Sequence, residues 1–198
     1  MTQDAPTANR TAEFDVDPLF IHRWSPRTMS GEPVSQRQLM TLFEAAKWAP
    51  SCFNEQPWRF LYAQRGSDHW DKFFGLLVEA NQQWCSNAAA LVVIASKKTF
   101  TRNGNPNPTH SYDAGAAWVS LALQGSSMGL VVHGMAGFDY AAAAEQLQVP
   151  DDYKIEAMAA IGQPAGLDKL PERFHDGEVP SQRRPLTDLV MEGGFTSV

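Results

Sequence analysis

The stretch APSCFNEQPW, residues 49–58, joins two segments of different periodicity. Two prolines, Pro50 and Pro57, bracket a run of small and amide side chains just before a segment typical of a strand. The Asn and Gln side chains of this run carry paired donor and acceptor groups, which match the imide edge of a heterocycle. Taken alone, however, the stretch favours a simple capped turn between a helix and a strand.

Working outward from this stretch, helical and extended patterns alternate. Ser35 is typical of an N-cap with Gln38 as its capping-box partner, and Pro50 ends the helix that follows. A short continuous apolar run at 91–95 fits a strand buried on both faces. The other expected elements are strands at 58–63, 130–132 and 155–161, helices at 68–83, 112–128 and 141–147, and a loop at 101–110. This mixture indicates an α/β or α+β fold in which helices outweigh strands.

The expected helix at 112–128 is unusual for its small residues. Ala114, Ala116, Ala117 and Ala122 fill little space, but they let another helix approach closely. We therefore expect this helix to be central or to lie at an interface.

Length, charge and cysteine content limit the classes of protein to which this chain can belong. The chain has 198 residues, 43% of them hydrophobic, and a net charge of −6. We expect a flexible arm at 1–15 and a single domain at 16–198. The negative charge argues against nucleic-acid binding and against docking on anionic membranes. Cys52 and Cys85 form no CxxC pair, and neither a membrane span nor a secretory signal is evident, so we expect a cytoplasmic protein.

The familiar catalytic motifs are missing from the sequence. The five histidines show no metal-ligand spacing, and there is neither a G-x-S-x-G elbow nor a phosphate-binding P-loop. Gly125 and Gly129 do not make a dinucleotide fingerprint. No metal site is predicted, and a protein of this kind either binds something or uses the chemistry of a cofactor.

Arginines are concentrated in two short segments. Arg23-Trp-Ser-Pro-Arg27 presents two guanidinium groups and the hydroxyl of Ser25, and Arg183-Arg184 presents two more. In an acidic chain, four of the 16 Lys and Arg residues in two such clusters indicate an anion site suited to a phosphate monoester. A pair of solvated surface turns is the alternative.

A glycine-bracketed turn is expected at the end of the segment GLVVHGMAGFD, residues 129–139. Gly134 and Gly137 would let backbone N–H groups approach a flat ligand. Taken alone, the segment is also typical of a plain turn from a strand to a helix.

Together and in this order, from about Phe20 to Val190, these segments resemble the nitroreductase-like FMN-dependent oxidoreductase family. The resemblance rests on R-x-S-x-R, APSxxNxQPW, the GL…GF turn and the late basic-Pro-Leu element. It implies an α+β fold with a central mixed sheet flanked by helices. It also implies one FMN-binding domain and an intertwined homodimer with two FMN sites at its interface.

The resemblance also implies roles for individual residues. The start of the domain would contact phosphate, ribityl chain and ring, the 50–56 segment would reach the flavin of the other subunit, and the late arginines would clamp the phosphate. Arg27 is the candidate cation for the negative charge near N1 of reduced flavin. The implied cofactor-binding residues are Arg23, Trp24, Ser25, Arg27, Pro50, Ser51, Cys52, Asn54, Gln56, Asn81, Met135, Ala136, Gly137, Arg183 and Arg184.

Three positions depart from the family pattern. Cys52 stands where Ser is common, Trp84 where some members carry Lys near the flavin pyrimidine, and Ala136 where many carry an acidic residue. A backbone contact survives the first and third changes. The indole of Trp84 cannot supply a cation, which leaves Arg27 for that role.

The implied activity is that of an FMN-dependent oxidoreductase with NADH or NADPH as reductant. Two electrons would pass by ping-pong hydride transfer to a nitroaromatic, a quinone or a similar small acceptor. A flavin-dependent dehalogenase or a specialised dehydrogenase on the same scaffold is an alternative. A flavin-binding protein without turnover is another.

Overall fold

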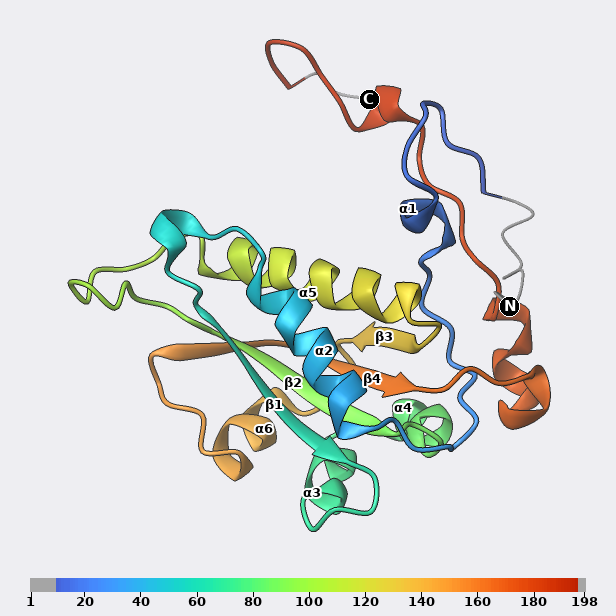
Figure 1. The fold of residues 1–198 in the computed structure, drawn as a ribbon. Coiled ribbons are helices and arrows are strands. Elements are labelled where there is room, and N and C mark those ends of the chain that lie inside the picture. The colour runs from blue at the N-terminus through green and yellow to red at the C-terminus, as the bar shows by residue number, and fades with distance from the viewer. Residues whose placement is uncertain (1–9, 196–198) are drawn as a thin grey trace.

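The computed structural model describes residues 10–195 and has a four-stranded sheet at its centre (Figure 1). The strands are β1 (Trp58–Gln64), β2 (Ala90–Lys97), β3 (Val131–Met135) and β4 (Tyr153–Gly162), in the order β1-β2-β4-β3. All three neighbouring pairs are antiparallel. The α+β class is confirmed, whereas the mixed sheet is wrong. Strands β2 and β3 do run in the same direction, but β4 lies between them, so the described strands form no parallel pair.

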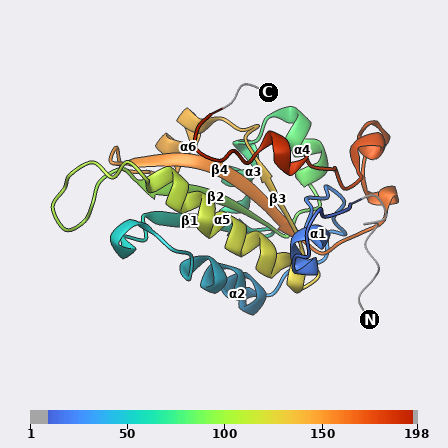
Figure 2. The ribbon, with the colours of Figure 1, turned by 90° about the horizontal axis from the view of Figure 1, so that it is seen from above.

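Helices α2 (Gln36–Lys47) and α5 (His110–Ser127) cover one face of the sheet. Figure 2, which looks down on this face, shows α5 crossing the strands with α2 beside it. The expected capping box is present: Ser35 Oγ accepts from the backbone N–H of Gln38 at 3.2 Å, and Gln38 Oε1 accepts from that of Ser35 at 3.0 Å. A Cβ on Gly125 would lie 2.3 Å from a methyl group of Val132, so this glycine lets α5 touch β3. The small residues therefore make α5 a central helix.

Helices α3 (Trp70–Gly75), α4 (Glu79–Cys85) and α6 (Tyr140–Gln146) lie on the other face (Figure 1). The single helix expected at 68–83 is wrong, because the chain breaks between α3 and α4. At the break, Leu77 forms an isolated bridge with Phe138, and the backbone N–H of Val78 donates to Gly137 O at 3.1 Å. These long-range bonds replace helical ones.

The strand β2 is buried on both faces, as its continuous apolar run predicted. Leu91 and Val93 pack in the core beneath α3, α4 and α6, while Val92 and Ile94 pack beneath α2 and α5. The sheet therefore separates two cores, and α5 packs against β2 and β3 on one side of it.

The two terminal segments run side by side away from the sheet (Figure 1). The N-terminal one includes α1 (Pro18–His22), and the C-terminal one carries short 3-10 turns at Leu167–Lys169, Glu172–Gly177 and Leu186–Asp188. Arg10 Nε donates to Ser181 O at 2.9 Å. The expected arm at 1–15 lies partly outside the described residues, and its described end is attached to the C-terminal segment. No helix between residues 10 and 195 has the length and apolar character that crossing a membrane requires.

Candidate functional site

A cavity of about 560 Å³ lies between α5 and the strands β3 and β4. The helix contributes one wall and the ends of the strands another, while the segment after α1 closes part of the rim. The lining residues are Arg23, Ser25, Ile94, Ser111, Ala114, Gly115, Trp118, Val119, Ala122, Gly134, Met135, Ala136, Glu156 and Ala157. Four of the sequence-predicted site residues, Arg23, Ser25, Met135 and Ala136, thus meet in one cavity.

Arg23, on the wall of this cavity, lies near Arg10 and Arg183, which line a second hollow. Arg23 is half-buried, and its guanidinium donates to Ser25 Oγ at 3.2 Å. Burial lowers the pKa of Arg23 and the nearby charge of Arg183 lowers it further, while Arg10 has its pKa lowered by burial, Arg183 and Arg23. Between residues 10 and 195, none of the three has a carboxylate within 4.0 Å. Mutual repulsion without a compensating acid is the arrangement expected of an anion-binding site.

The remaining residues of the two arginine clusters lie outside the cavity wall. Arg184 lines a second hollow together with Arg183, between the two terminal segments. Trp24 is half-buried. The guanidinium of Arg27 lies 3.8 Å from Glu178 Oε2 and packs over the ring of Phe174. The structure therefore separates Arg27 from Arg23, and its role near a flavin stays a prediction.

The turn at 135–137 is held by Asn81. Asn81 Nδ2 donates to Gly137 O at 2.9 Å, and its Oδ1 accepts from Trp84 Nε1 at 3.1 Å. A Cβ on Gly137 would lie 2.6 Å from Asn81 Nδ2, so a side chain at this position would displace the Asn81 amide from its hydrogen bonds. Gly134 is similarly confined, because a Cβ there would come within 2.8 Å of the Trp118 ring. Asn81 thus fixes the turn, and in this conformation its amide is engaged within the subunit.

The 50–56 segment lies at the N-terminal end of α5 and does not line the cavity of its own subunit. The backbone N–H of Cys52 donates to Asp113 Oδ2 at 3.1 Å, and that of Gln56 donates to Ser51 Oγ at 3.0 Å. Phe53, Asn54 and Gln56 all have positive φ, at 51°, 58° and 51°. The exposed Pro50 precedes this strained turn. The predicted contacts of this segment with the flavin of a second subunit stay a prediction.

Sequence reasoning missed four acidic or hydroxyl residues of the site region. Ser111 and Glu156 line the cavity, Asp113 holds the 50–56 segment, and Glu178 accepts hydrogen bonds at the end of the R-x-S-x-R segment. Two of them left a signal: Glu156 is the only charged residue in the apolar run 155–161, and Asp113 the only Asp, Glu, Lys or Arg within α5. A charged side chain inside a buried helix or strand needs a polar partner, so each of these residues indicated a contact with another segment of the chain.

Comparisons with known proteins agree on one family. The family model described as "Nitroreductase family" matches residues 21–83 and 63–163, together more than half of the chain. A crystal structure of an oxidoreductase containing FMN is 44% identical, covers 100% of both chains and superposes with a TM-score of 0.92.

More distant relatives share the fold. A provisionally assigned nitroreductase from Desulfovibrio desulfuricans, solved in complex with FMN, is 23% identical, with a TM-score of 0.72 and coverage of 98% of this chain and 100% of that one. A Streptomyces coelicolor protein provisionally named NADH dehydrogenase/NAD(P)H nitroreductase is 25% identical over 182 residues, which are 80% of this chain and 89% of the relative.

Proposed function

Because this chain belongs to the nitroreductase family, we propose that it is an FMN-dependent NAD(P)H oxidoreductase that passes two electrons to a small acceptor. The acceptor class is a nitroaromatic, a quinone or a similar flat molecule. The observation that carries the proposal is the cavity beside α5, which joins Arg23, without a carboxylate partner among the described residues, to the turn that begins at Gly134. The FMN of the 44% identical neighbour and the reductant in the name of the Streptomyces relative support it.

The residues present fit FMN. Arg23, Arg183 and the hydroxyl of Ser25 offer planar donors and positive charge to a phosphate monoester, and no carboxylate of the described chain neutralises the two arginines. Gly134, Met135 and Ala136 form one wall of the cavity, and the missing side chain of Gly134 leaves room for a flat ring to approach the backbone. When bound, FMN supplies the hydride chemistry, since its ring system accepts and donates a hydride.

The side chains of this protein would then bind, orient and exclude water. Trp118, Val119 and Ala122 present an apolar helix face to the cavity, which suits a stacked aromatic reductant or acceptor. Asn81 holds the turn in place through Gly137, so the backbone groups of the turn are positioned before a ligand arrives. One apolar stacking position would serve the reductant and the acceptor in turn, which explains a ping-pong order.

We also propose a homodimer. The terminal segments expose large apolar side chains far from the core: Phe14 is 70% exposed, Phe20 60%, Leu189 57% and Phe195 93%. Isolated apolar side chains are common on surfaces, but two adjacent segments that expose several of them are typical of an interaction site. The 50–56 segment, which lies outside the cavity of its own subunit, would complete the site of the other.

The test is a spectrum of the purified protein followed by anaerobic titration with NADH and NADPH. Non-covalent FMN at one per subunit, bleached by one reductant and reoxidised by a quinone or nitroaromatic, is the expected result. Released FAD, or a protein that cannot be reconstituted with FMN, would defeat the proposal. Bound FMN that no dihydronicotinamide reduces would favour a flavin-binding protein without turnover. Sedimentation tests the dimer: an FMN-loaded monomer at micromolar concentration contradicts it.

A further inference from the structure

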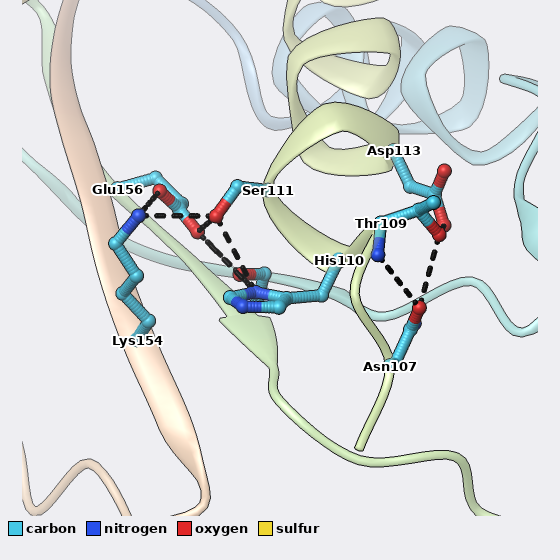
Figure 3. Close-up of polar contacts among 8 residues, drawn as sticks. Asn107, Thr109, His110, Ser111, Asp113, Lys154 and Glu156 are labelled. Carbon is cyan, nitrogen blue, oxygen red and sulfur yellow. Dashed lines mark hydrogen bonds and ion pairs between the residues drawn. The ribbon is translucent and has the colours of Figure 1, made fainter.

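Four polar side chains gather around Glu156 at one end of the cavity (Figure 3). They and Glu156 come from three elements: Ser96 from β2, Lys154 and Glu156 from β4, and His110 and Ser111 from the first turn of α5. Ser111 and Glu156 line the cavity that also contains Met135 and Ala136. The segment that follows α1 and carries Arg23 passes the other end of α5 (Figure 1). The cavity therefore has a second polar region, distinct from the arginines.

The backbone directs Glu156 into this position. In the β2–β4 ladder, Ile94 pairs with Ala157 and Ala95 pairs with Ile155, so Glu156 is the extra residue of a β-bulge. A bulge redirects a side chain that the regular alternation of a strand would place elsewhere. Met135, the last residue of β3, pairs with Met158 of β4, and Met158 lies two residues after Glu156 in that strand. The bulge thus brings a carboxylate close to the end of β3.

The carboxylate of Glu156 is held as an anion by three donors. Its Oε1 accepts from Ser96 Oγ at 2.5 Å and from Ser111 Oγ at 2.7 Å, while Lys154 Nζ lies 2.9 Å from Oε2. Burial raises the pKa of Glu156, but the hydrogen bonds from Ser96, Lys154 and Ser111 outweigh burial, and the pKa lies below its ordinary value. The group is therefore ionised at neutral pH and accepts hydrogen bonds without donating one.

The positions of the hydrogens follow from these contacts. Ser96 Oγ lies between Glu156 Oε1 and His110 Nδ1, which is 2.7 Å away, and a hydroxyl has only one hydrogen. Because ionised Glu156 has none, Ser96 donates to Glu156 and accepts from an N–H at His110 Nδ1. Ser111 likewise donates to Glu156 and accepts from Lys154 Nζ at 3.0 Å. Every one of these hydrogens points into the cluster, so Ser111 and Glu156 offer only lone pairs to the cavity.

We propose that Ser111 and Glu156 form a hydrogen-bond-accepting subsite, which binds an N–H group of a ligand in the cavity. This inference rests on the proposed function, because that function supplies two ligands with such a group. One is the imide N–H of FMN, and the other is the carboxamide N–H of the dihydronicotinamide. An acceptor-only wall binds either of them and disfavours an anionic group that carries lone pairs alone, such as a carboxylate.

Two pairs of ligands and two variants test the subsite. The first ligand pair is FMN and 3-methyl-FMN, titrated into the FMN-free full-length protein and followed by flavin fluorescence. The second is 1-benzyl-1,4-dihydronicotinamide and its 3-acetyl analogue, whose dissociation constants are obtained from the anaerobic bleaching of the FMN-loaded protein. The variants are Ser111→Ala and Glu156→Gln. Ser120→Ala is the matched control, because Ser120 lies on the same helix, donates to Ala116 O at 3.0 Å and does not line the cavity.

Wild type and Ser120→Ala should prefer the N–H member of one pair by about five- to tenfold, the effect of one hydrogen bond. Ser111→Ala and Glu156→Gln should each reduce that preference toward one. If the two variants lose the preference within the FMN pair, the imide N–H is the bound donor. If they lose the preference within the nicotinamide pair, the bound donor is the carboxamide N–H. Folded variants, shown by wild-type thermal unfolding, that keep both preferences unchanged would overturn the subsite while the proposed function stands. A protein that binds no FMN would overturn both.

Discussion

Glu178 Oε1 accepts a hydrogen bond from the backbone N–H of Arg27 at 2.6 Å, across 151 positions of the sequence. The same oxygen accepts from the backbone N–H and the hydroxyl of Thr28, at 2.8 and 3.0 Å. Glu178 is buried, and its other oxygen faces the guanidinium of Arg27. The C-terminal segment thus holds the end of the R-x-S-x-R segment, whose beginning contributes Arg23 to the cavity.

Replacing Glu178 should destabilise the protein. In Glu178→Ala, the part-buried backbone N–H of Arg27 and the buried N–H and hydroxyl of Thr28 lose their acceptor, and Arg27 loses its counter-charge. We expect the free energy of unfolding to fall by about 3 kcal/mol, measured by urea denaturation at fixed protein concentration. Glu44→Ala is the control, because the Glu44–Lys47 pair is exposed and exposed ion pairs contribute little to stability. Equal losses in both variants would contradict the role of Glu178.

Arg23 should act on FMN affinity rather than on the rate of turnover. Its guanidinium faces the cavity rim without a carboxylate partner among the described residues, so a phosphate would supply the missing charge. Arg23→Ala should weaken FMN binding by about 1.5–3 kcal/mol, and saturating FMN should restore most of the turnover. Arg37→Ala, on the exposed side of α2, should leave the dissociation constant unchanged. Unaltered FMN affinity in Arg23→Ala would remove the phosphate from this end of the cavity.

Arg27 and Glu178 together provide a test of the redox role expected for Arg27. If the guanidinium stabilises the anionic reduced flavin, Arg27→Ala should lower the flavin midpoint potential and slow hydride uptake at saturating FMN. Glu178→Gln removes the neighbouring negative charge and should raise the potential. Potentials are measured by anaerobic dye equilibration. A wild-type potential in both variants would make Arg27 a structural partner of Glu178 and Phe174 only.

Local patterns of the sequence predicted the local structure. The Ser35 capping box, the doubly buried β2 and the small-residue helix each depend on residues within one element, and all three are present. The resemblance added the order of the segments, and four of the expected site residues do line one cavity. The local features were predictable because their hydrogen bonds and apolar spacing involve residues that are close together in the sequence.

Features that depend on distant partners were not predictable. The break between α3 and α4 follows from bonds to Phe138 and Gly137, some 60 residues away in sequence, which helical periodicity cannot reveal. The bulge at Glu156 depends on the register with β2, and a period-two pattern carries no information about an inserted residue. The family resemblance implied a mixed sheet, but the order of the described strands places β4 between β2 and β3, which run in the same direction.

His133 should make the stability of the protein depend on pH. Its ring packs against Trp84 with centroids 4.6 Å apart, and Nδ1 lies 3.0 Å from Pro26 O, which requires an N–H at that nitrogen. Burial lowers the pKa of His133 below its ordinary value of 6.5, Arg27 lowers it further, and Pro26 and Glu178 act in the opposite direction. Because the unfolded chain then binds this proton at a higher pH than the folded chain, the stability is fully present above about pH 6.5. It is lost as the pH falls from there through the pKa of the folded state, by at most about 1.4 kcal/mol per pH unit for one proton.

His133→Gln keeps an N–H donor but does not titrate, so its free energy of unfolding should change less than that of the wild type in this window. His69→Gln, at an exposed position, should follow the wild-type curve. Urea denaturation at a series of pH values compares the three proteins, and coincident slopes for wild type and His133→Gln would show that His133 takes up no proton on unfolding.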